Sequence, residues 1–214
     1  MARGLERRLE RLLDGVAGRV FSGRLHSSEI AGKLAREADF ARFEHETGPA
    51  TGNAFTILVN PLDLSVDPKE LEQNLADEMT QYTREEGLRL EGPVAVTIES
   101  SDDVAAGNVA CHVEVVPGPP VVWARLVSDS ESLEVGRNRA LVGRAPSCDV
   151  VVAGQDVSRK HALIWRQAGK ISLLDLDSSN GTSIDGARIQ TEPVGLHQGS
   201  VVGFGDHRYR LVEI

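Results

Sequence analysis

Residues 141–164 read LVGRAPSCDVVVAGQDVSRKHALI, and this stretch decides the fold of the second half of the chain. Its runs rich in Val, Leu and Ile alternate with short segments of Gly, Pro, Ser and Asp, which are turn-forming residues. Apolar runs this short, bounded by turn residues, predict strands rather than helices. Polar residues stand at the turns: Gly143-Arg144 follows the first run, and the segment SRKH, residues 158–161, precedes the last.

The same alternation of short apolar runs and turns extends over residues 121–214. The runs recur about every 8–12 residues, a spacing typical of an all-β sandwich. Asp185-Gly186 lies between two of them and favours a type I′ hairpin turn. A sandwich gathers alternate loops at one of its ends, so we expect Gly143-Arg144, residues 158–161 and Ser179-Asn180 to lie together there.

The side chains of these three loops suit a phosphorylated peptide. Arg144 and Arg159 offer forked donors that match phosphate oxygens. Ser158 and Ser179 add compact hydroxyl donors. The amide of Asn180 both donates and accepts, which suits the backbone of an extended peptide. The loops therefore predict a phosphopeptide site, and the chain shows no spacing that predicts a metal site or a cofactor.

In order and spacing, these blocks resemble the forkhead-associated (FHA) domain, a phosphothreonine-binding β-sandwich. The resemblance covers residues 121–214 and rests on LVGRAPSCDVVV, VSRKHALI, LLDLDSSNGTSIDGARI and LHQGSVVGFGDHRYRL. It implies about eleven strands in two sheets, with the peptide held by loops at one end. It also implies which residues contact the phosphopeptide: Arg144, Ser158, Arg159, Ser179 and Asn180. The residues that it implies shape the loops are Gly143, His161, Gly181 and Thr182.

The first 120 residues predict a different, mixed fold. Leu5, Leu9 and Leu12 recur at helical spacing, and Ser27 or Ser28 could cap a second helix. The elements expected in chain order are a helix from the N-terminus, a helix over 28–44, a loop over 45–53, a strand over 54–60, a helix over 68–86, and strands over 93–100 and 108–116. This ααβαββ order predicts a two-layer α+β domain.

The two halves meet at a Pro/Gly-dense stretch, VPGPPVV, and differ in charge. Residues 1–120 hold 12 basic and 21 acidic residues, whereas residues 121–214 hold 11 of each. We therefore expect an α+β domain over 1–115, a short linker over 116–120 and an FHA domain over 121–214.

Residues 1–115 resemble the N-terminal domain of actinobacterial FhaA-type proteins. The matching segments are LERRLERLLDGVAGRVF, SSEIAGKLAREAD, NAFTILVNPLDL and LADEMTQYTREEGLRLEGPVAVTIES. The resemblance implies a cytoplasmic signalling adaptor that regulates cell-wall (peptidoglycan) synthesis and is recruited to the inner face of the membrane only through its partners. Those partners would be phosphothreonine-containing Ser/Thr kinases or their substrates, with the pseudokinase domain of a lipid II flippase as one candidate.

Composition excludes several other classes. Lys+Arg is 23 and Asp+Glu is 32, so the net charge of −9 disfavours nucleic-acid binding, which needs a basic surface. Cys111 and Cys148 form no ligand spacing and suggest buried thiols in a reducing compartment. Thr47 and Thr51 fall in the expected loop, where phosphorylation would allow self-association between copies.

Two alternatives to a phosphothreonine adaptor follow from the same residues. Ser158 and His161 invite a hydrolase interpretation, but positions i and i+3 of a strand point to opposite faces. We therefore expect no enzyme. The other alternative is a structural or oligomerisation protein that uses the FHA fold for phospho-independent protein binding.

Overall fold

The computed structural model describes residues 2–21 and 25–214, and the chain divides into two compact units. The first unit comprises residues up to Glu44, Ala50–Thr83 and Leu90–Pro119. The second unit comprises Pro120–Ile214 together with two short segments of the N-terminal half, His45–Pro49 and Arg84–Arg89.

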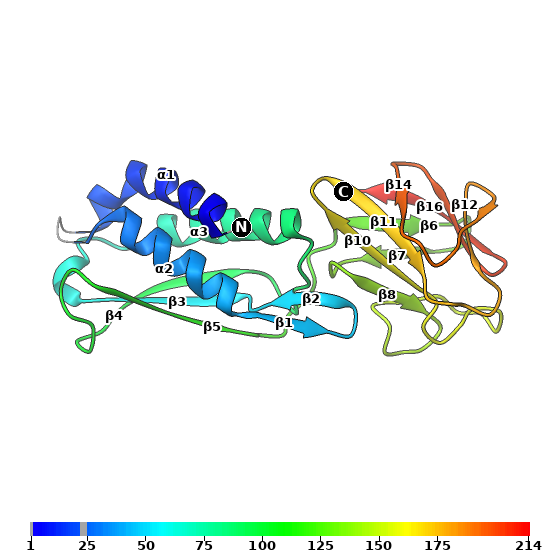
Figure 1. The fold of residues 1–214 in the computed structure, drawn as a ribbon, viewed down its shortest axis with the longest axis horizontal. Coiled ribbons are helices and arrows are strands. Elements are labelled where there is room, and N and C mark those ends of the chain that lie inside the picture. Colours follow the sequence, from blue (N-terminus) through cyan, green and yellow to red (C-terminus); the bar gives the residue numbers. More distant parts are fainter. Residues whose placement is uncertain (1, 22–24) are drawn as a thin grey trace. The chain divides into compact units, whose positions relative to one another are not determined.

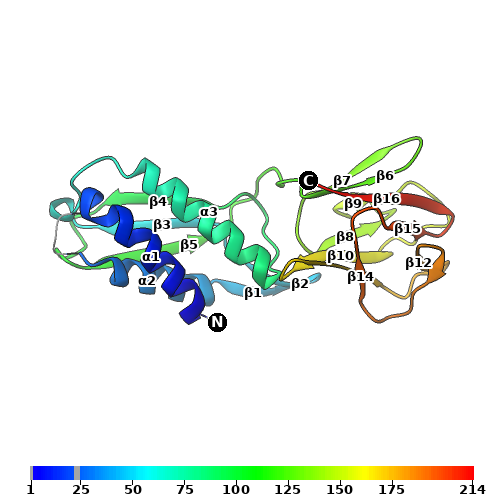
Figure 2. The same ribbon diagram turned by 90° about the horizontal axis from the view of Figure 1, so that it is seen from above.

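The first unit is a sheet covered on one face by three helices (Figures 1 and 2). Its strand order is β4-β3-β5, with β3 parallel to β4 and antiparallel to β5. Its elements are α1 (Ala2–Val20), α2 (Ser27–Phe40), β3 (Ala54–Val59), η1 (Pro61–Asp63), α3 (Lys69–Glu86, whose last turn belongs to the second unit), β4 (Ala95–Ser100) and β5 (Val109–Glu114). The mixed α+β class predicted from the sequence is confirmed.

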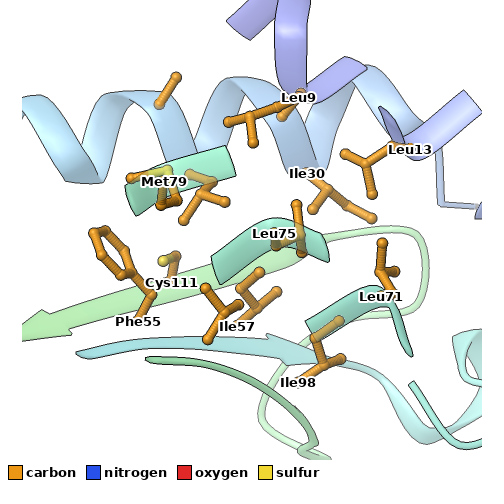
Figure 3. Packing of buried hydrophobic residues seen from close by; sticks show 14 of the residues in the cluster. Leu9, Leu13, Ile30, Phe55, Ile57, Leu71, Leu75, Met79, Ile98 and Cys111 are labelled. Carbon is orange, nitrogen blue, oxygen red and sulfur yellow. The ribbon is translucent and has the colours of Figure 1, made fainter. Parts of the chain in front are cut away.

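The helices and the sheet bury a common core, shown in Figure 3. Leu9 and Leu13 of α1 and Met79 of α3 are fully buried in it. Alternate residues of β3, among them Ile57, point into the core as the period of a strand requires. Cys111 also lies there, and burial raises the pKa of its thiol to about 12, so this cysteine is a neutral core group. In the described part of the chain, no helix is long and apolar enough to span a membrane.

The predicted end of the second helix, at residue 44, is wrong. This helix stops at Phe40, and residues expected to form a loop make a hairpin of β1 (Arg42–His45) and β2 (Gly48–Thr51). Gly48 supplies a φ of +111°, which favours glycine. The α2 cap prediction is also wrong, because the N-cap residue is His26, which makes no side-chain cap hydrogen bond.

The expected phosphorylation sites lie in this hairpin rather than in an accessible loop. Thr47 is 6% exposed and Thr51 is 2% exposed. The Thr51 hydroxyl donates to the carbonyl of Ala38. A kinase needs an extended, exposed substrate segment, so the structure gives no support to phosphorylation of these threonines.

The second unit contains a β-sandwich of a five-stranded sheet, β14-β11-β10-β8-β9, and a six-stranded sheet, β13-β12-β15-β16-β6-β7. The strands are β6 (Ala124–Val127), β7 (Ser132–Val135), β8 (Ala140–Gly143), β9 (Val150–Val151), β10 (Ala162–Gln167), β11 (Lys170–Asp175), β12 (Thr182–Ile184), β13 (Ala187–Arg188), β14 (Val194–Leu196), β15 (Val201–Phe204) and β16 (His207–Glu213). This arrangement confirms the predicted sandwich of about eleven strands.

Inward-facing residues of both sheets form the sandwich core, with Val142 and Ile164 from one sheet and Phe204 and Leu211 from the other. The turn between β12 and β13 has the expected I′ form, because Asp185 and Gly186 both have positive φ (50° and 84°). Regular strands on a packed core give the connecting loops a rigid support.

Candidate functional site

Three loops of the sandwich form an open cleft of about 700 Å³. The loops are those after β8, before β10 and after β11. Together they bring into one cleft all five side chains that the sequence assigns to phosphopeptide contact: Arg144, Ser158, Arg159, Ser179 and Asn180.

Hydrogen bonds between the loops fix the shape of this cleft. The backbone N–H of Arg144 donates to the Ser158 carbonyl at 3.0 Å. The hydroxyl of Ser158 accepts from the backbone N–H of Ser179 at 3.0 Å, which leaves its own proton for an anion in the cleft. The side-chain amide of Asn180 donates to the Asp156 carbonyl at 2.7 Å. The amide oxygen of Asn180 can therefore accept from a peptide N–H while its nitrogen stays held.

The two arginines of the cleft are exposed and available to a ligand. Among the residues that the structure describes, no hydrogen bond or ion pair engages the guanidinium group of Arg144 or Arg159. Two exposed guanidinium groups beside the Ser158 hydroxyl form a donor set suited to a phosphate dianion.

Gly143 occupies a position where a side chain has no room. A Cβ atom there would lie 2.4 Å from the Arg159 carbonyl oxygen and 3.0 Å from that of Ser158. The absence of a side chain thus lets the loop of Arg144 approach the loop of Ser158 and Arg159 closely.

We predict that Gly143→Ala destabilises the second unit by about 1–3 kcal/mol, because the new methyl group must displace backbone atoms. Denaturant unfolding followed by tryptophan fluorescence measures this, since both tryptophans, Trp123 and Trp165, lie in the second unit. Gly195→Ala is the matched control, because a Cβ atom at Gly195 meets nothing within 4 Å. Equal stability of the two variants would contradict the close approach.

His161 holds the loop from inside the sandwich. It is fully buried, accepts from the backbone N–H of Ser158 at its Nδ1 atom (3.0 Å), and places Nε2 3.2 Å from the Gly181 carbonyl. Its ring packs edge-on against Phe204. These contacts define a neutral imidazole with its proton on Nε2, bonded to the backbone of Ser158 and not to its hydroxyl. A Ser-His dyad therefore does not form.

The buried imidazole predicts a loss of stability in weak acid. Burial lowers the pKa of His161 below its ordinary value, so the unfolded chain takes up a proton first as the pH falls below about 6.5. The free energy of unfolding should be level above that pH and decline below it by up to ~1.4 kcal/mol per pH unit. Fluorescence-monitored unfolding between pH 7.5 and 5.5 tests this, and His161→Asn should flatten the decline. Stability that rises on acidification would contradict the assignment.

The sequence did not identify two residues that shape the site, Asp175 and Ser178. Asp175 accepts from the Ser178 backbone N–H at 2.9 Å, from the Ser178 hydroxyl at 2.6 Å and from the Thr182 hydroxyl. Burial raises the pKa of Asp175, but these hydrogen bonds outweigh it and hold the pKa below its usual range. The Ser178 hydroxyl also accepts from the N–H of Gly181, whose φ is +83°. An ionised Asp175 thus shapes the loop that presents Asn180, and its only signal in the sequence is a polar residue within the run LLDLD.

The remaining polar groups form no metal centre among the described residues. Within them, no group of three or more His, Cys, Asp or Glu side chains could hold a metal ion. Cys148 is buried with its sulfur 3.1 Å from the Arg159 carbonyl, and burial raises the pKa of its thiol. Its neutral thiol is thus a packing group beneath the cleft.

Comparisons with known proteins match each half of the chain to a protein family. The FhaA N-terminal domain family matches residues 3–112, and the FHA domain family matches residues 140–205. No curated protein sequence matches the chain.

Solved structures of FHA domains are similar to part of the chain, and that of one larger protein is similar to nearly all of it. The FHA domain of FhaA, solved in complex with the intracellular domain of Rv3910, is 24% identical, over 42% of this chain and 98% of that chain, with a TM-score of 0.37. The N-terminal FHA domain of S. cerevisiae Rad53p, in complex with a phosphothreonine peptide, is 19% identical over 44% and 94%, with a TM-score of 0.39. Mycobacterium tuberculosis EmbR, in complex with a low-affinity phosphopeptide, is 16% identical over 98% and 41%, with a TM-score of 0.40.

The FhaA N-terminal family covers more than half of the chain, and the FHA family covers all three loops of the cleft. The chain therefore belongs to the FhaA-type family, with an FhaA N-terminal domain followed by an FHA domain.

Proposed function

We propose that this protein is a non-enzymatic adaptor whose FHA domain, residues 121–214, binds phosphothreonine peptides through Arg144, Ser158, Arg159, Ser179 and Asn180. The observation that carries the proposal is the convergence of two unengaged guanidinium groups and the Ser158 hydroxyl in one open cleft. Arg144 and Arg159 neutralise the phosphate, Ser158 donates to it, Ser179 lies beside it, and Asn180 bonds the backbone of the peptide.

The energetics of such a site fit a reversible signalling contact. A charge-assisted hydrogen bond contributes about 1.5–3 kcal/mol. Three or four such bonds, less the ordering cost of the peptide, correspond to dissociation constants on the order of micromolar. Without the phosphate most of these bonds have no acceptor, so binding depends on phosphorylation.

We further propose that the adaptor acts in Ser/Thr-kinase control of peptidoglycan synthesis. The proposal rests on membership of the FhaA-type family and on the complex of the FhaA FHA domain with the intracellular domain of Rv3910. The partner classes are an autophosphorylated receptor kinase and a membrane protein of lipid-precursor transport that carries a phosphorylated cytoplasmic domain.

A complementation experiment tests the cellular role. In an actinobacterium lacking its own FhaA-type protein, the wild-type chain should restore incorporation of a fluorescent D-amino acid into new peptidoglycan, and Arg144→Ala should fail to do so. Restoration by both would show that the role does not depend on reading phosphothreonine. Restoration by neither, with both chains folded and expressed, would argue against the link to cell-wall synthesis.

A further inference from the structure

A carboxylate from outside the FHA sequence stands beside the cleft. Glu46, at the tip of the β1–β2 hairpin, places its Oε2 atom 2.5 Å from the Nζ atom of Lys160. Lys160 lines the cleft next to Arg159. The segment that carries Glu46 is His45–Pro49, one of the two N-terminal segments that belong to the second unit.

We propose that the Glu46–Lys160 pair is a specificity-determining element of the phosphopeptide site: it disfavours acidic residues near the phosphothreonine and favours basic ones. The inference rests on the proposed function and assigns the charge of the peptide flank that the site selects. Glu46 belongs to no motif of the FHA domain and lies 114 residues from its partner.

The hairpin tip is held in place against the sandwich, so Glu46 has a defined position. The backbone N–H of Arg89 donates to the Pro49 carbonyl at 3.0 Å, and the side chain of Arg89 pairs with Asp149 of the sandwich. A Cβ atom at Gly48 would lie 2.8 Å from a guanidinium nitrogen of Arg139, which shows how closely the tip packs. Thr47 is 6% exposed, and its hydroxyl lies 2.9 Å from His45 Nδ1.

The charges of Glu46 and Lys160 determine the electrostatic environment of a peptide residue that binds beside Lys160. The hydrogen bond and charge of Lys160 lower the pKa of Glu46, so the carboxylate is ionised at neutral pH. Without Glu46, Lys160 would be a third free cation beside Arg144 and Arg159. With Glu46 in place, an acidic peptide residue must compete for Lys160 and meets a like charge, whereas a basic residue gains a carboxylate partner.

The pair has little importance for the fold itself. Both side chains are about half exposed, 54% for Lys160 and 55% for Glu46. Exposed ion pairs contribute little to stability. Substitutions at these two positions should therefore leave the second unit folded, and their effects should appear in peptide binding.

The test uses the full chain and alanine-rich peptides with a central phosphothreonine. Each peptide carries Glu or Lys at one position from three residues before to three residues after the phosphothreonine. For the wild type, at least one position should favour Lys over Glu by about 2- to 5-fold in dissociation constant. Glu46→Gln should abolish or reverse this preference. Glu44→Gln is the matched control, because it removes the same charge from an exposed residue of β1 that is not the partner of Lys160.

A Lys/Glu preference that is equal in wild type and Glu46→Gln at every position would overturn the inference while leaving the proposed function intact. Lys160→Ala should strengthen the preference for Lys, because it removes a cation and leaves the Glu46 carboxylate unpaired, and a preference for Glu in this variant would also overturn the inference. Absence of phosphate-dependent binding to every peptide would overturn the proposed function together with the inference. The three failures are thus distinguishable.

Discussion

Replacing Arg144 with alanine is expected to weaken binding of a phosphothreonine peptide by about 10- to 150-fold. The guanidinium group lines the cleft with no hydrogen bond or ion pair to another described residue, so its donors are free for the phosphate. Removing one charge-assisted contact costs about 1.5–3 kcal/mol, which gives this range. The side chain is exposed, so the fold should not change.

Isothermal titration of the full chain with a phosphothreonine peptide from a kinase activation loop measures the effect. Arg125→Ala is the matched control, because Arg125 is an exposed arginine of β6 that does not line the cleft. It should bind as the wild type does, apart from a small change in long-range charge. Undiminished binding by Arg144→Ala would favour the alternative in which the FHA fold binds its partner independently of phosphate.

Replacing Arg89 with alanine is expected to destabilise the second unit by about 3–5 kcal/mol. Arg89 and Asp149 form a two-pronged pair with nitrogen–oxygen distances of 2.8 and 2.9 Å, and their side chains are 7% and 12% exposed. Asp149 also accepts from the Leu141 backbone N–H at 2.9 Å. Burial raises the pKa of Asp149, but the hydrogen bonds from Arg89 and Leu141 and the charges of Arg89 and Arg137 together outweigh it, and the pKa lies below its usual range. Removing Arg89 leaves the mostly buried carboxylate of Asp149, next to β8, with only the N–H of Leu141 and the more distant guanidinium of Arg137 at 3.8 Å.

Denaturant unfolding followed by tryptophan fluorescence reports on this change, because Trp123 and Trp165 both lie in the second unit. Arg125→Ala again serves as the control, since its pair with Glu134 is exposed and long, at 3.5 Å. Asp149→Asn in the Arg89→Ala background should recover part of the loss by removing the carboxylate charge that has lost its two-pronged partner. A stability within about 1 kcal/mol of the wild type would mean that the pair behaves like a surface pair.

A shortened chain should lose these contacts as well. A fragment of residues 120–214 lacks Arg89 and the hairpin tip at 45–49, and it should lose a similar amount of stability. It would also lack Glu46, the partner of the cleft residue Lys160. Peptide preferences measured on such a fragment are therefore expected to differ from those of the full chain in the response to flanking charge.

The sandwich and its cleft could be predicted because their signals are local. Each signal spans only a few positions of sequence. The signals are the strands of β-branched residues, the Asp185-Gly186 turn and the loop residues at 143–144, 158–161 and 179–180. The sandwich then brings the loops together at one end. The helices of the first unit were predictable for a related reason, since Leu5 and Leu9 repeat at the helical period.

The contribution of the N-terminal half to the second unit could not be predicted in this way. Arg89 and Asp149 are 60 residues apart, and Glu46 and Lys160 are 114 residues apart. The segment HETGPATGN has the composition of a solvated loop, and nothing within it indicates that Glu46 faces a lysine of a distant strand connection. Long-range pairs of this kind form only in the completed tertiary structure. The spacing of apolar residues and the composition of turns predict local elements but not such pairs.

The most direct test of phosphothreonine recognition is calorimetric titration of the full chain with two peptides identical except for one phosphate on threonine. We predict binding of the phosphorylated peptide with a dissociation constant on the order of micromolar, and no measurable binding of the unphosphorylated one. Saturable binding of both peptides with equal affinity would contradict it, because Arg144, Ser158 and Arg159 would then have no part in recognition.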